Sequence, residues 1–561
     1  MKRLLPVLLI MAFAFVHAQD PKPQDTATTI LAYNVEIGFN NASKLLETAE
    51  WILTLDPEVI LFQEIARQDS DGFANLARLW GHSYAAVAKP FTDYSIALTS
   101  KHPFDMIETR TADLHHGYVL AKINGVYFMS IHTSPFDYAR RIQETAIYVR
   151  RIKPLLDAGE KLIMMGDFNN YSPMDKERFD DRLEKMDPVK REAYIKGRGK
   201  NMNNGKYDYV STQQLLDAGL IDVGYEWMKE HNIRYSSRID LALLSPNLKD
   251  DVVESYVEFP KWKYFSQFSD HWPNILKLKN LNFPKAPAPL PLPPEPELEV
   301  VPGAVNLVTN GSFDNGLEGW KKEIRTADLG SVEVIDGAAK ITRLPKSTFG
   351  RIYQDMAVEP GKYYTLTFRR FMDKGALTKA LVIFRGPDDK WRESTRFTYE
   401  FPWRPGVWQQ GKYTFKTSDD VNYLRLDFRL DRNDFRLQSD ISYMLDDVVL
   451  RLATEKEIAD VTMPPPEQRP AFQPTADWRD ADGLVIRDMD VPPNANMTLS
   501  LTVPPLDRAA SVKVFFMDKN GNRIPNSLIT FNLQPNPNTQ AINAPILTSF
   551  SAMRLRAQLV K

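Results

Sequence analysis

The chain has 561 residues, a formal net charge of −2 and no cysteine. A chain of this length divides into several domains, and its nearly neutral charge gives no overall attraction to nucleic acid or to anionic membranes. The absence of cysteine excludes disulfide bonds and thiolate metal sites, so the fold must be stabilised by packed cores. Any affinity for a polyanion must therefore be local.

The N-terminal residues have the pattern of a secretory signal. Lys2 and Arg3 precede an apolar run over residues 4–16, and the small residue Ala18 follows it closely. A run of about 13 apolar residues is shorter than the ~20 that span a bilayer. We therefore expect residues 1–18 to be cleaved near Ala18 and the mature chain, without a transmembrane segment, to be exported to the periplasm or the extracellular space. An uncleaved membrane anchor is the alternative.

Residues 25–282 alternate strand-like and helix-like patterns. Apolar residues at helical spacing fill residues 42–55 and 139–156. Such alternation predicts an α/β layer fold. Four apolar runs of strand length each end in polar side chains, which should emerge together at strand ends. These runs are residues 30–33 before Asn34, 59–62 before Gln63 and Glu64, 126–131 before His132, and 162–165 before Gly166 and Asp167.

Within this unit, a densely charged stretch, residues 176–194, is followed by a basic, glycine-containing stretch, residues 196–206. We expect a charged helix followed by a flexible loop. The excursion either simply faces water or forms a flap over the site, since long loops in compact domains often bind ligands.

The second half of the chain has a different composition. Residues 283–303 are rich in proline and should form an extended spacer. Residues 304–454 are rich in aromatic and β-branched residues with frequent turns, which is typical of a β-sandwich. A further linker, residues 455–475, precedes a small β-domain, residues 476–561, that carries no chemical motif. Trp391, Trp403 and Trp408 either form a stacking platform or lie in the sandwich core.

The polar groups of the first unit suit phosphodiester hydrolysis, which needs a cation, a positioned water and a proton donor for the leaving oxygen. Glu64, fixed at a strand end, suits Mg²⁺, which prefers a few carboxylates and retained waters. Asp270 would complete the metal shell. Asp167 and Asn169 are two positions apart and point the same way in an extended chain, so that Asp167 can orient water while Asn169 donates to the phosphate.

Two histidines supply the remaining chemistry. His132 and His271 follow predicted strands, and a pair of imidazoles can act as base or phosphate ligand on one side and as leaving-group acid on the other. Asp240 would fix the tautomer of one of them.

The order of these segments resembles the endonuclease/exonuclease/phosphatase superfamily, whose members share a four-layered α/β sandwich. The signature is an early Asn, Gln-Glu, a central His, Gly-Asp-Phe-Asn, Asp and Ser-Asp-His, and it covers residues 28–279. The resemblance implies a Mg²⁺ cofactor, with Mn²⁺ or Ca²⁺ as alternatives. It implies metal-binding roles for Asn34, Glu36, Glu64 and Asp270, and catalytic roles for His132, Asp167, Asn169, Asp240 and His271.

The substrate branch is left open by the sequence. Residues 131–135 resemble secreted pancreatic-type deoxyribonucleases, but Ala66 stands where that branch has a DNA-contacting arginine, and its disulfides are absent. We expect an exported Mg²⁺-dependent phosphodiesterase, a nuclease, acting on nucleic acid or another phosphodiester. The alternatives are a phospholipid or sugar-phosphate phosphoesterase, similar to sphingomyelinases or inositol phosphatases, and an inactive glycan-binding or adhesion protein.

The middle unit has a resemblance of its own. Residues 306–320 and 443–450 are similar to the two ends of carbohydrate-binding jelly-roll modules. This resemblance implies polysaccharide as a partner and a structural Ca²⁺ near the opening segment.

Overall fold

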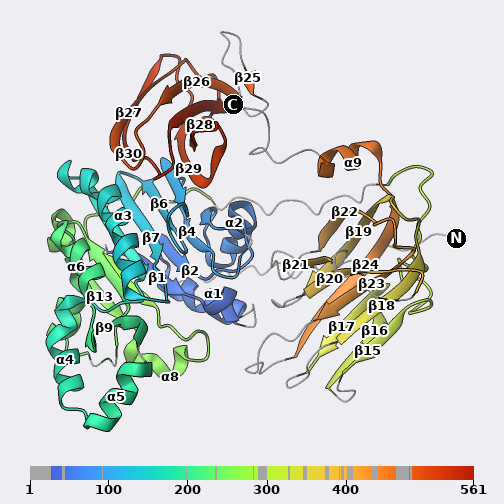
Figure 1. The fold of residues 1–561 in the computed structure, drawn as a ribbon, viewed down its shortest axis with the longest axis horizontal. Coiled ribbons are helices and arrows are strands. Elements are labelled where there is room, and N and C mark those ends of the chain that lie inside the picture. Colours follow the sequence, from blue (N-terminus) through green and yellow to red (C-terminus); the bar gives the residue numbers. More distant parts are fainter. Residues whose placement is uncertain are drawn as a thin grey trace.

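The computed structural model is shown in Figure 1. The expected signal segment, residues 1–18, lies outside the residues that it describes, as do Trp391, Trp403 and large parts of both linkers. In the part of the chain that is described, no helix is long and apolar enough to cross a membrane. The described residues are 27–40, 44–90, 92–197, 199–233, 235, 237–281, 283–288, 300–325, 329–344, 350–372, 378–388, 390, 392, 397–400, 408–430, 440–462, 479–480 and 483–560.

Residues 28–278 form two mixed sheets that pack face to face, with helices on the outer faces (Figure 1). The first sheet has the order β13-β14-β1-β2-β4-β3, and the second begins β11-β12-β8-β7-β6-β5. Two neighbouring pairs, β1 with β2 and β7 with β8, are parallel. The strands are β1 (Thr28–Asn34), β2 (Val59–Gln63), β3 (Tyr84–Ala88), β4 (Ile96–Ser100), β5 (Met106–Arg110), β6 (Tyr118–Ile123), β7 (Val126–His132), β8 (Lys161–Asp167), β11 (Ile221–Asp222), β12 (Asp240–Leu244), β13 (Val252–Val257) and β14 (Asn274–Leu278).

The central strands are apolar on both faces because each face contacts a different core. In β1, Ile30 lies between the two sheets, whereas Leu31 faces helices α1 (Leu45–Leu55) and α2 (Ser70–Ala77). In β8, Ile163 lies between the sheets and Leu162 packs toward α3 (Tyr138–Asp157). The result is the expected α/β layer fold, and the helices predicted at residues 42–55 and 139–156 are confirmed as α1 and α3.

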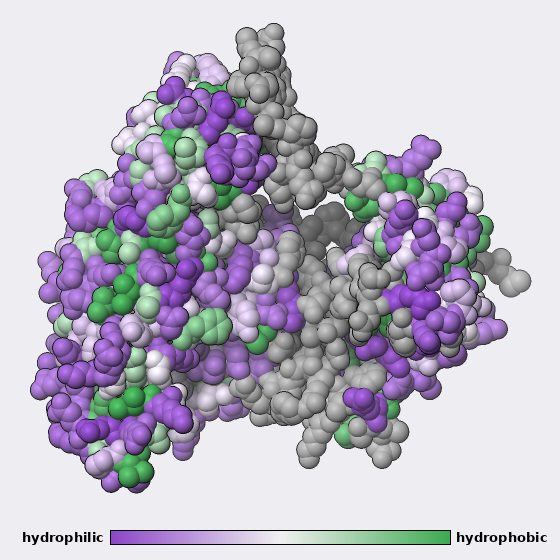
Figure 2. Space-filling view, in the orientation of Figure 1, coloured by the Kyte–Doolittle hydropathy of each residue, from purple (hydrophilic) through white to green (hydrophobic). Residues whose placement is uncertain are grey.

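Three shorter helices complete the outer layers of this unit. They are α6 (Val210–Asp217), α7 (Val223–Glu230) and α8 (Trp262–Phe265). Figure 2 shows a largely hydrophilic surface, with apolar residues in separate small patches, as expected when the apolar faces of the strands and helices lie inside.

The charged excursion differs from its prediction. It forms two helices, α4 (Lys176–Glu184) and α5 (Pro188–Gly197), because a proline disfavours helical geometry in the residue before it. The expected flexible loop contains a short hairpin of β9 (Met202–Asn203) and β10 (Lys206–Tyr207). Buried aromatic side chains, among them Phe179, hold the excursion against the domain. It is therefore more than a solvated surface segment.

The middle unit is a β-sandwich of two five-stranded sheets around a core of its own. Trp320 is buried in this core, and its Nε1 donates to the Asn310 carbonyl over 3.0 Å, so the opening segment has a structural role. The expected linker at residues 455–475 begins instead with a helix, α9 (Glu455–Thr462). The strands are β15 (Lys321–Ile324), β16 (Gly330–Ile335), β17 (Ala338–Arg343), β18 (Gly350–Ala357), β19 (Tyr363–Met372), β20 (Thr378–Arg385), β21 (Phe397–Glu400), β22 (Gln409–Lys416), β23 (Tyr423–Leu430) and β24 (Ile441–Leu452).

The C-terminal strands extend the second catalytic sheet instead of forming the separate small domain expected from the sequence. Strand β29 pairs antiparallel with β5, and the sheet continues through β28, β31, β26 and β25 (Figure 1). Strands β27 and β30 form a two-stranded sheet that packs on the same core as α3. The strands are β25 (Arg479–Asp480), β26 (Gly483–Asp490), β27 (Asn496–Val503), β28 (Ala510–Met517), β29 (Arg523–Leu533), β30 (Gln540–Leu547) and β31 (Arg554–Val560).

Candidate active site

The predicted polar groups lie at one edge of the two packed sheets. Asn34 ends β1 beside Gln63, which ends β2, and His132 ends β7 beside Asp167, which ends β8. Asp240, at the start of the antiparallel strand β12, pairs with Asp167. The parallel pairs place their strand ends together, as the sequence predicts.

Gly166 allows the two sheets to approach closely beside this edge. Its φ is +146°, and an added Cβ would lie 2.1 Å from the Ile131 carbonyl oxygen and 2.9 Å from Nε2 of Gln63. Gln63 is fully buried, and its Nε2 donates to Oγ of Ser130 over 3.2 Å, which links the sheets. Gln63 is thus a structural bridge, and position 166 requires glycine.

A single oxygen, Oδ2 of Asp167, lies at the centre of the site. Nε2 of His132 lies 3.4 Å from it and Nε2 of His271 lies 3.6 Å from it. The side-chain amides of Asn34 and Asn169 donate to the same oxygen over 3.3 and 3.2 Å. Four of the predicted residues therefore converge on one carboxylate, which is buried.

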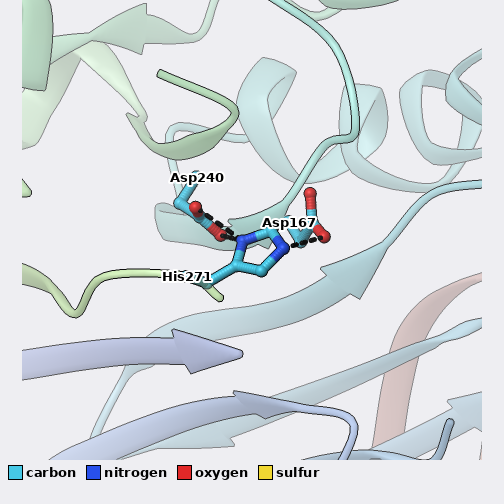
Figure 3. Close-up of side chains that lie close together, drawn as sticks. All are labelled: Asp167, Asp240 and His271. Atoms are coloured by element: carbon cyan, nitrogen blue, oxygen red, sulfur yellow. Dashed lines mark hydrogen bonds and ion pairs between the residues drawn. The ribbon is translucent and has the colours of Figure 1, made fainter. Parts of the chain in front are cut away.

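His271 lies between two carboxylates, as Figure 3 shows. Its Nδ1 lies 2.9 Å from Oδ2 of Asp240, while its Nε2 faces Asp167. Burial alone would lower the pKa of His271, but the charges of Asp240 and Asp167 outweigh this effect and raise that pKa well above its ordinary value. Burial would raise the pKa of Asp167, but the charge of His271 and the hydrogen bond from His132 hold that pKa below its usual range. The expected pairing of Asp240 with one histidine is with His271.

Glu64 is held in place by hydrogen bonds to both carboxylate oxygens. Its Oε1 accepts from Nδ2 of Asn34 over 3.3 Å, and its Oε2 accepts from the backbone N–H of Ile37 over 3.2 Å. The backbone N–H of Glu36 donates to Oδ1 of Asn34 over 3.1 Å. Ile37 has φ +47°, a left-handed conformation that is costly for a β-branched residue. The segment after β1 is thus bent so that it faces Glu64.

The acidic residues near β1 fit a hard cation. The hydroxyl of Tyr33 is buried and has no hydrogen-bond partner within the described ranges. Burial raises the pKa of that phenol, and the negative charges of Glu36, Asp240 and Asp270 raise it further. The side chain of Asp270 is exposed. Carboxylate and amide oxygens that are partly open to solvent suit Mg²⁺.

A second group of possible metal ligands overlaps the acid–base residues. One ligand atom each from Asp167, Asp240 and His271 lies within 4.8 Å of the others. A protonated imidazole has no lone pair for a metal, and the two carboxylates favour protonation of His271. This group therefore suits proton chemistry better, and Glu64 with its neighbours suits the metal better.

His116 belongs to the site and was missed from the sequence. Its ring stacks on that of His132, with centroids 4.0 Å apart and an interplanar angle of 11°. Burial lowers the pKa of His116, and the charge of His132 lowers it further, so His116 is neutral. The available signal was the pair His115-His116, which only Gly117 separates from the apolar run that begins β6.

Arg141 joins the excursion to the end of β7. This arginine of α3 is fully buried, and its Nη1 donates to the Ser134 carbonyl over 3.0 Å. Its Nη2 donates to the Lys200 carbonyl over 2.7 Å and to Oδ1 of Asn201 over 2.8 Å. Lys200 and Asn201 are thereby held near the end of β7, and the role of the excursion as a substrate-contacting flap stays a prediction.

Parts of this chain resemble known proteins. No curated protein matches this sequence. Similar solved structures include an AP endonuclease from Archaeoglobus fulgidus, with 17% identity over 45% of this chain and 100% of that chain (TM-score 0.34). They also include the 3'-5' exonuclease NExo from Neisseria meningitidis, with 21% identity over 45% and 100% (TM-score 0.34), and a structure titled "CBM4 structure and function", with 20% identity over 26% and 99% (TM-score 0.21). Residues 31–271 match the model of the Endonuclease/Exonuclease/phosphatase family, which supports the resemblance found in the sequence.

Proposed function

We propose that this chain is a divalent-metal-dependent phosphodiesterase that cleaves nucleic acid. The observation that carries the proposal is the convergence of His132, His271, Asn34 and Asn169 on Oδ2 of Asp167, beside the carboxylate of Glu64. Proton donors, a proton acceptor and hard metal ligands thus occupy one edge of the sandwich. The match of residues 31–271 to a family of endonucleases, exonucleases and phosphatases supports the same reaction class.

Each acid–base residue has its own role in the displacement at phosphorus. His271, held cationic by Asp240 and Asp167, donates Nε2–H to a nonbridging phosphate oxygen. Asp167 accepts a hydrogen bond from the attacking water and takes its proton as the new P–O bond forms. His132 protonates the leaving oxygen as the old P–O bond breaks. Because Nε2 of His132 and Oδ2 of Asp167 are 3.4 Å apart, the proton can then return from Asp167 to His132.

Asn169 and Ser269 keep the acid–base residues in position. Asn169 has φ +45°, and its Nδ2 donates both to Asp167 and to the Thr133 carbonyl, the latter over 3.2 Å. It therefore orients Asp167 here and can turn its amide toward a bound phosphate. Oγ of Ser269 donates to the Asn34 carbonyl over 2.7 Å and accepts from the N–H of His271 over 3.1 Å, which fixes the Ser-Asp-His segment against β1.

A divalent cation held by Glu64, with Asn34, Glu36 and Asp270 nearby, would neutralise the nonbridging phosphate oxygens. Its proposed identity is Mg²⁺, with Mn²⁺ or Ca²⁺ as alternatives, because the residues offer oxygen donors. We also propose a structural Ca²⁺ in the middle sandwich, near its opening segment.

Export and polysaccharide binding complete the proposal. The basic, apolar and small-residue pattern of residues 1–18 supports secretion. The middle sandwich would then hold the enzyme near polysaccharide. A glycan array with the full chain tests this role, and the absence of binding to every glycan would point to a purely structural module.

The substrate is tested with a panel of DNA, RNA, sphingomyelin, inositol phosphates and an aryl phosphodiester, each with Mg²⁺ and with chelator. We expect cleavage of DNA or RNA that chelator abolishes. Release of phosphocholine or inorganic phosphate with intact nucleic acid would identify a phospholipid or sugar-phosphate phosphoesterase instead. Glycan binding without hydrolysis of any substrate would favour an inactive adhesion protein.

A further inference from the structure

A cavity of about 150 Å³ lies between the catalytic unit and the C-terminal strands. The catalytic unit contributes Lys89 and Pro90 after β3 and Thr109 to Thr111 at the end of β5, and the C-terminal strands contribute Arg523 and Ser527 of β29. Such a volume admits several water molecules or one small oxyanion. The cavity exists only because β29 pairs with β5.

The strand registers place the cavity at the same edge as the candidate active site. Ala88, the last residue of β3, pairs with Ile96, and Ile96 pairs with Gln63 of β2. In the second sheet, Ser527 pairs with Arg110, and β5 connects through β6 to the end of β7, where His132 lies. A substrate bound across this edge would therefore reach both the active site and the cavity.

A direct contact links the cavity to the histidines of the site. Nζ of Lys89 donates to the His115 carbonyl over 3.0 Å. The next residue is His116, which stacks on His132. The backbone of His115 and the ring of His116 thus lie between Lys89 and His132.

The lining of the cavity contains three basic residues. It includes Lys89, Arg110 and Arg523 and no aspartate or glutamate among the residues that the structure describes. Arg110 is paired with Asp113 over 3.1 Å and donates to the Leu547 carbonyl, so it has a structural role. Burial lowers the pKa of Lys89, and the charge of Glu144 only partly offsets this effect.

Lys89 and Arg523 bring basic groups to the cavity from its two sides. The guanidinium of Arg523 lies 4.8 Å from the ring centroid of Phe515, which limits its orientations. Thr109 and Thr111 of the catalytic unit also line the cavity. Lysine, arginine and hydroxyl side chains are the groups that proteins use to contact phosphate.

We propose that this cavity is a subsite for a second phosphate of a polynucleotide strand, held by Lys89 and Arg523 while a neighbouring phosphodiester lies at Asp167. The inference rests on the proposed function and names the part of the substrate that the C-terminal strands recognise. Substrates with several phosphates are thereby preferred over a lone phosphodiester.

The experiment compares the full-length chain with its Arg523→Gln and Lys89→Gln variants. The matched control is Lys519→Gln, which removes an exposed cation from the loop between β28 and β29. Binding of a labelled single-stranded oligonucleotide is measured by fluorescence anisotropy in chelator, where no cleavage is expected. Hydrolysis is measured with Mg²⁺ on the same oligonucleotide and on bis(p-nitrophenyl) phosphate, which has one phosphodiester and no neighbouring phosphate.

We expect each subsite variant to weaken oligonucleotide binding about fivefold and to lower the ratio of kcat/KM for the two substrates by a similar factor. The slope of log affinity against log salt is negative, and its magnitude should decrease by about 0.7 per cation removed from a single-strand contact. Arg523→Lys should restore part of the binding. The control should bind as the wild type does.

Two results would overturn the subsite. One is oligonucleotide binding in both variants equal to that of Lys519→Gln, and the other is an equal loss on both hydrolysis substrates in variants with an unchanged Tm. If the wild type cleaves neither substrate but the variants still weaken binding as expected, the proposed function fails while the phosphate subsite stands.

Discussion

The two β-rich regions that follow the catalytic unit differ in what their apolar faces contact. In the middle sandwich, Phe368 and Phe428 pack with residues of the same unit. In the C-terminal strands, Phe516 and Leu555 share one core with Tyr148 of α3. Both regions have similar alternating patterns, so alternation predicts strands but does not predict which core they join.

The difference arises at the edge of the catalytic sheet. Without β29, strand β5 would expose unpaired backbone groups, which invite aggregation. Two side-chain hydrogen bonds also cross the junction between the catalytic unit and the C-terminal strands. Nη1 of Arg110 donates to the Leu547 carbonyl over 3.2 Å, and Nδ2 of Asn532 donates to the Phe104 carbonyl over 2.9 Å. The C-terminal strands are therefore part of the catalytic fold, whereas the middle sandwich has an independent core.

Deleting each region should give the largest contrast. Removal of residues 483–560 exposes the β5 edge and half of a shared core, so we expect an insoluble or unfolded product. Removal of residues 300–462 leaves the catalytic sheets intact, so we expect a soluble chain with unchanged oligonucleotide hydrolysis. Expression, circular dichroism and hydrolysis check both results. A soluble, active chain without residues 483–560 would contradict the shared core.

Single core substitutions should show whether the two regions unfold in separate transitions. Phe516→Ala and Phe428→Ala each truncate a buried phenylalanine that is 1% exposed, at an expected cost of about 3–5 kcal/mol. Phe516→Ala should lower the Tm of the transition that also ends hydrolysis, whereas Phe428→Ala should lower only the sandwich transition. Calorimetry of the full chain with parallel activity assays checks this. If the Phe428→Ala variant loses hydrolysis at the lowered Tm of its sandwich, the two regions unfold together.

The sequence predicts the strands of the site because their runs are apolar on both faces and end in polar residues. It also predicts the candidate residues Asp167, His132 and His271, since their order follows a family signature. It does not predict the pairing of β29 with β5, which joins segments more than 400 residues apart and depends on which edge is open. Nor does it predict the stacking of His116 on His132, because no periodicity relates the two positions.

The stability of the two units should depend on pH in different ranges. Burial raises the pKa of Asp446 in the sandwich to about 6, so the stability it contributes is full below its ordinary value of 3.8 and is lost as pH rises toward 6. The pKa of His271 is raised well above 6.5, so its contribution is full below that pH and is lost as pH rises through the higher value.

Calorimetry in chelator between pH 4 and 9 tests this difference. The sandwich Tm should fall as pH rises toward 6, and the catalytic Tm should continue to fall at higher pH. Asp446→Asn should remove the first effect and leave the second. A catalytic Tm that rises steadily above pH 7 would disagree with a stabilising charge on His271.

The smallest expected effect is at the junction itself. Asn532→Ala removes the hydrogen bond to the Phe104 carbonyl and should cost about 1 kcal/mol. Ser511→Ala is the matched control, because it removes the exposed bond from Oγ of Ser511 to Oδ1 of Asn532 and leaves the bond to the Phe104 carbonyl in place. Urea unfolding followed by loss of hydrolysis measures both. Equal midpoints for the two variants would mean that this bond does not stabilise the junction.

The most direct test of the site is single-turnover cleavage of a labelled oligonucleotide with Mg²⁺ by the wild type, His271→Ala and His231→Ala. His231 directly follows α7, where it is exposed and stacks on Trp227. It serves as the control. We predict that His271→Ala lowers the cleavage rate by about 10²–10⁴-fold while His231→Ala cleaves as the wild type does. Cleavage by His271→Ala at the wild-type rate would contradict catalysis at this site.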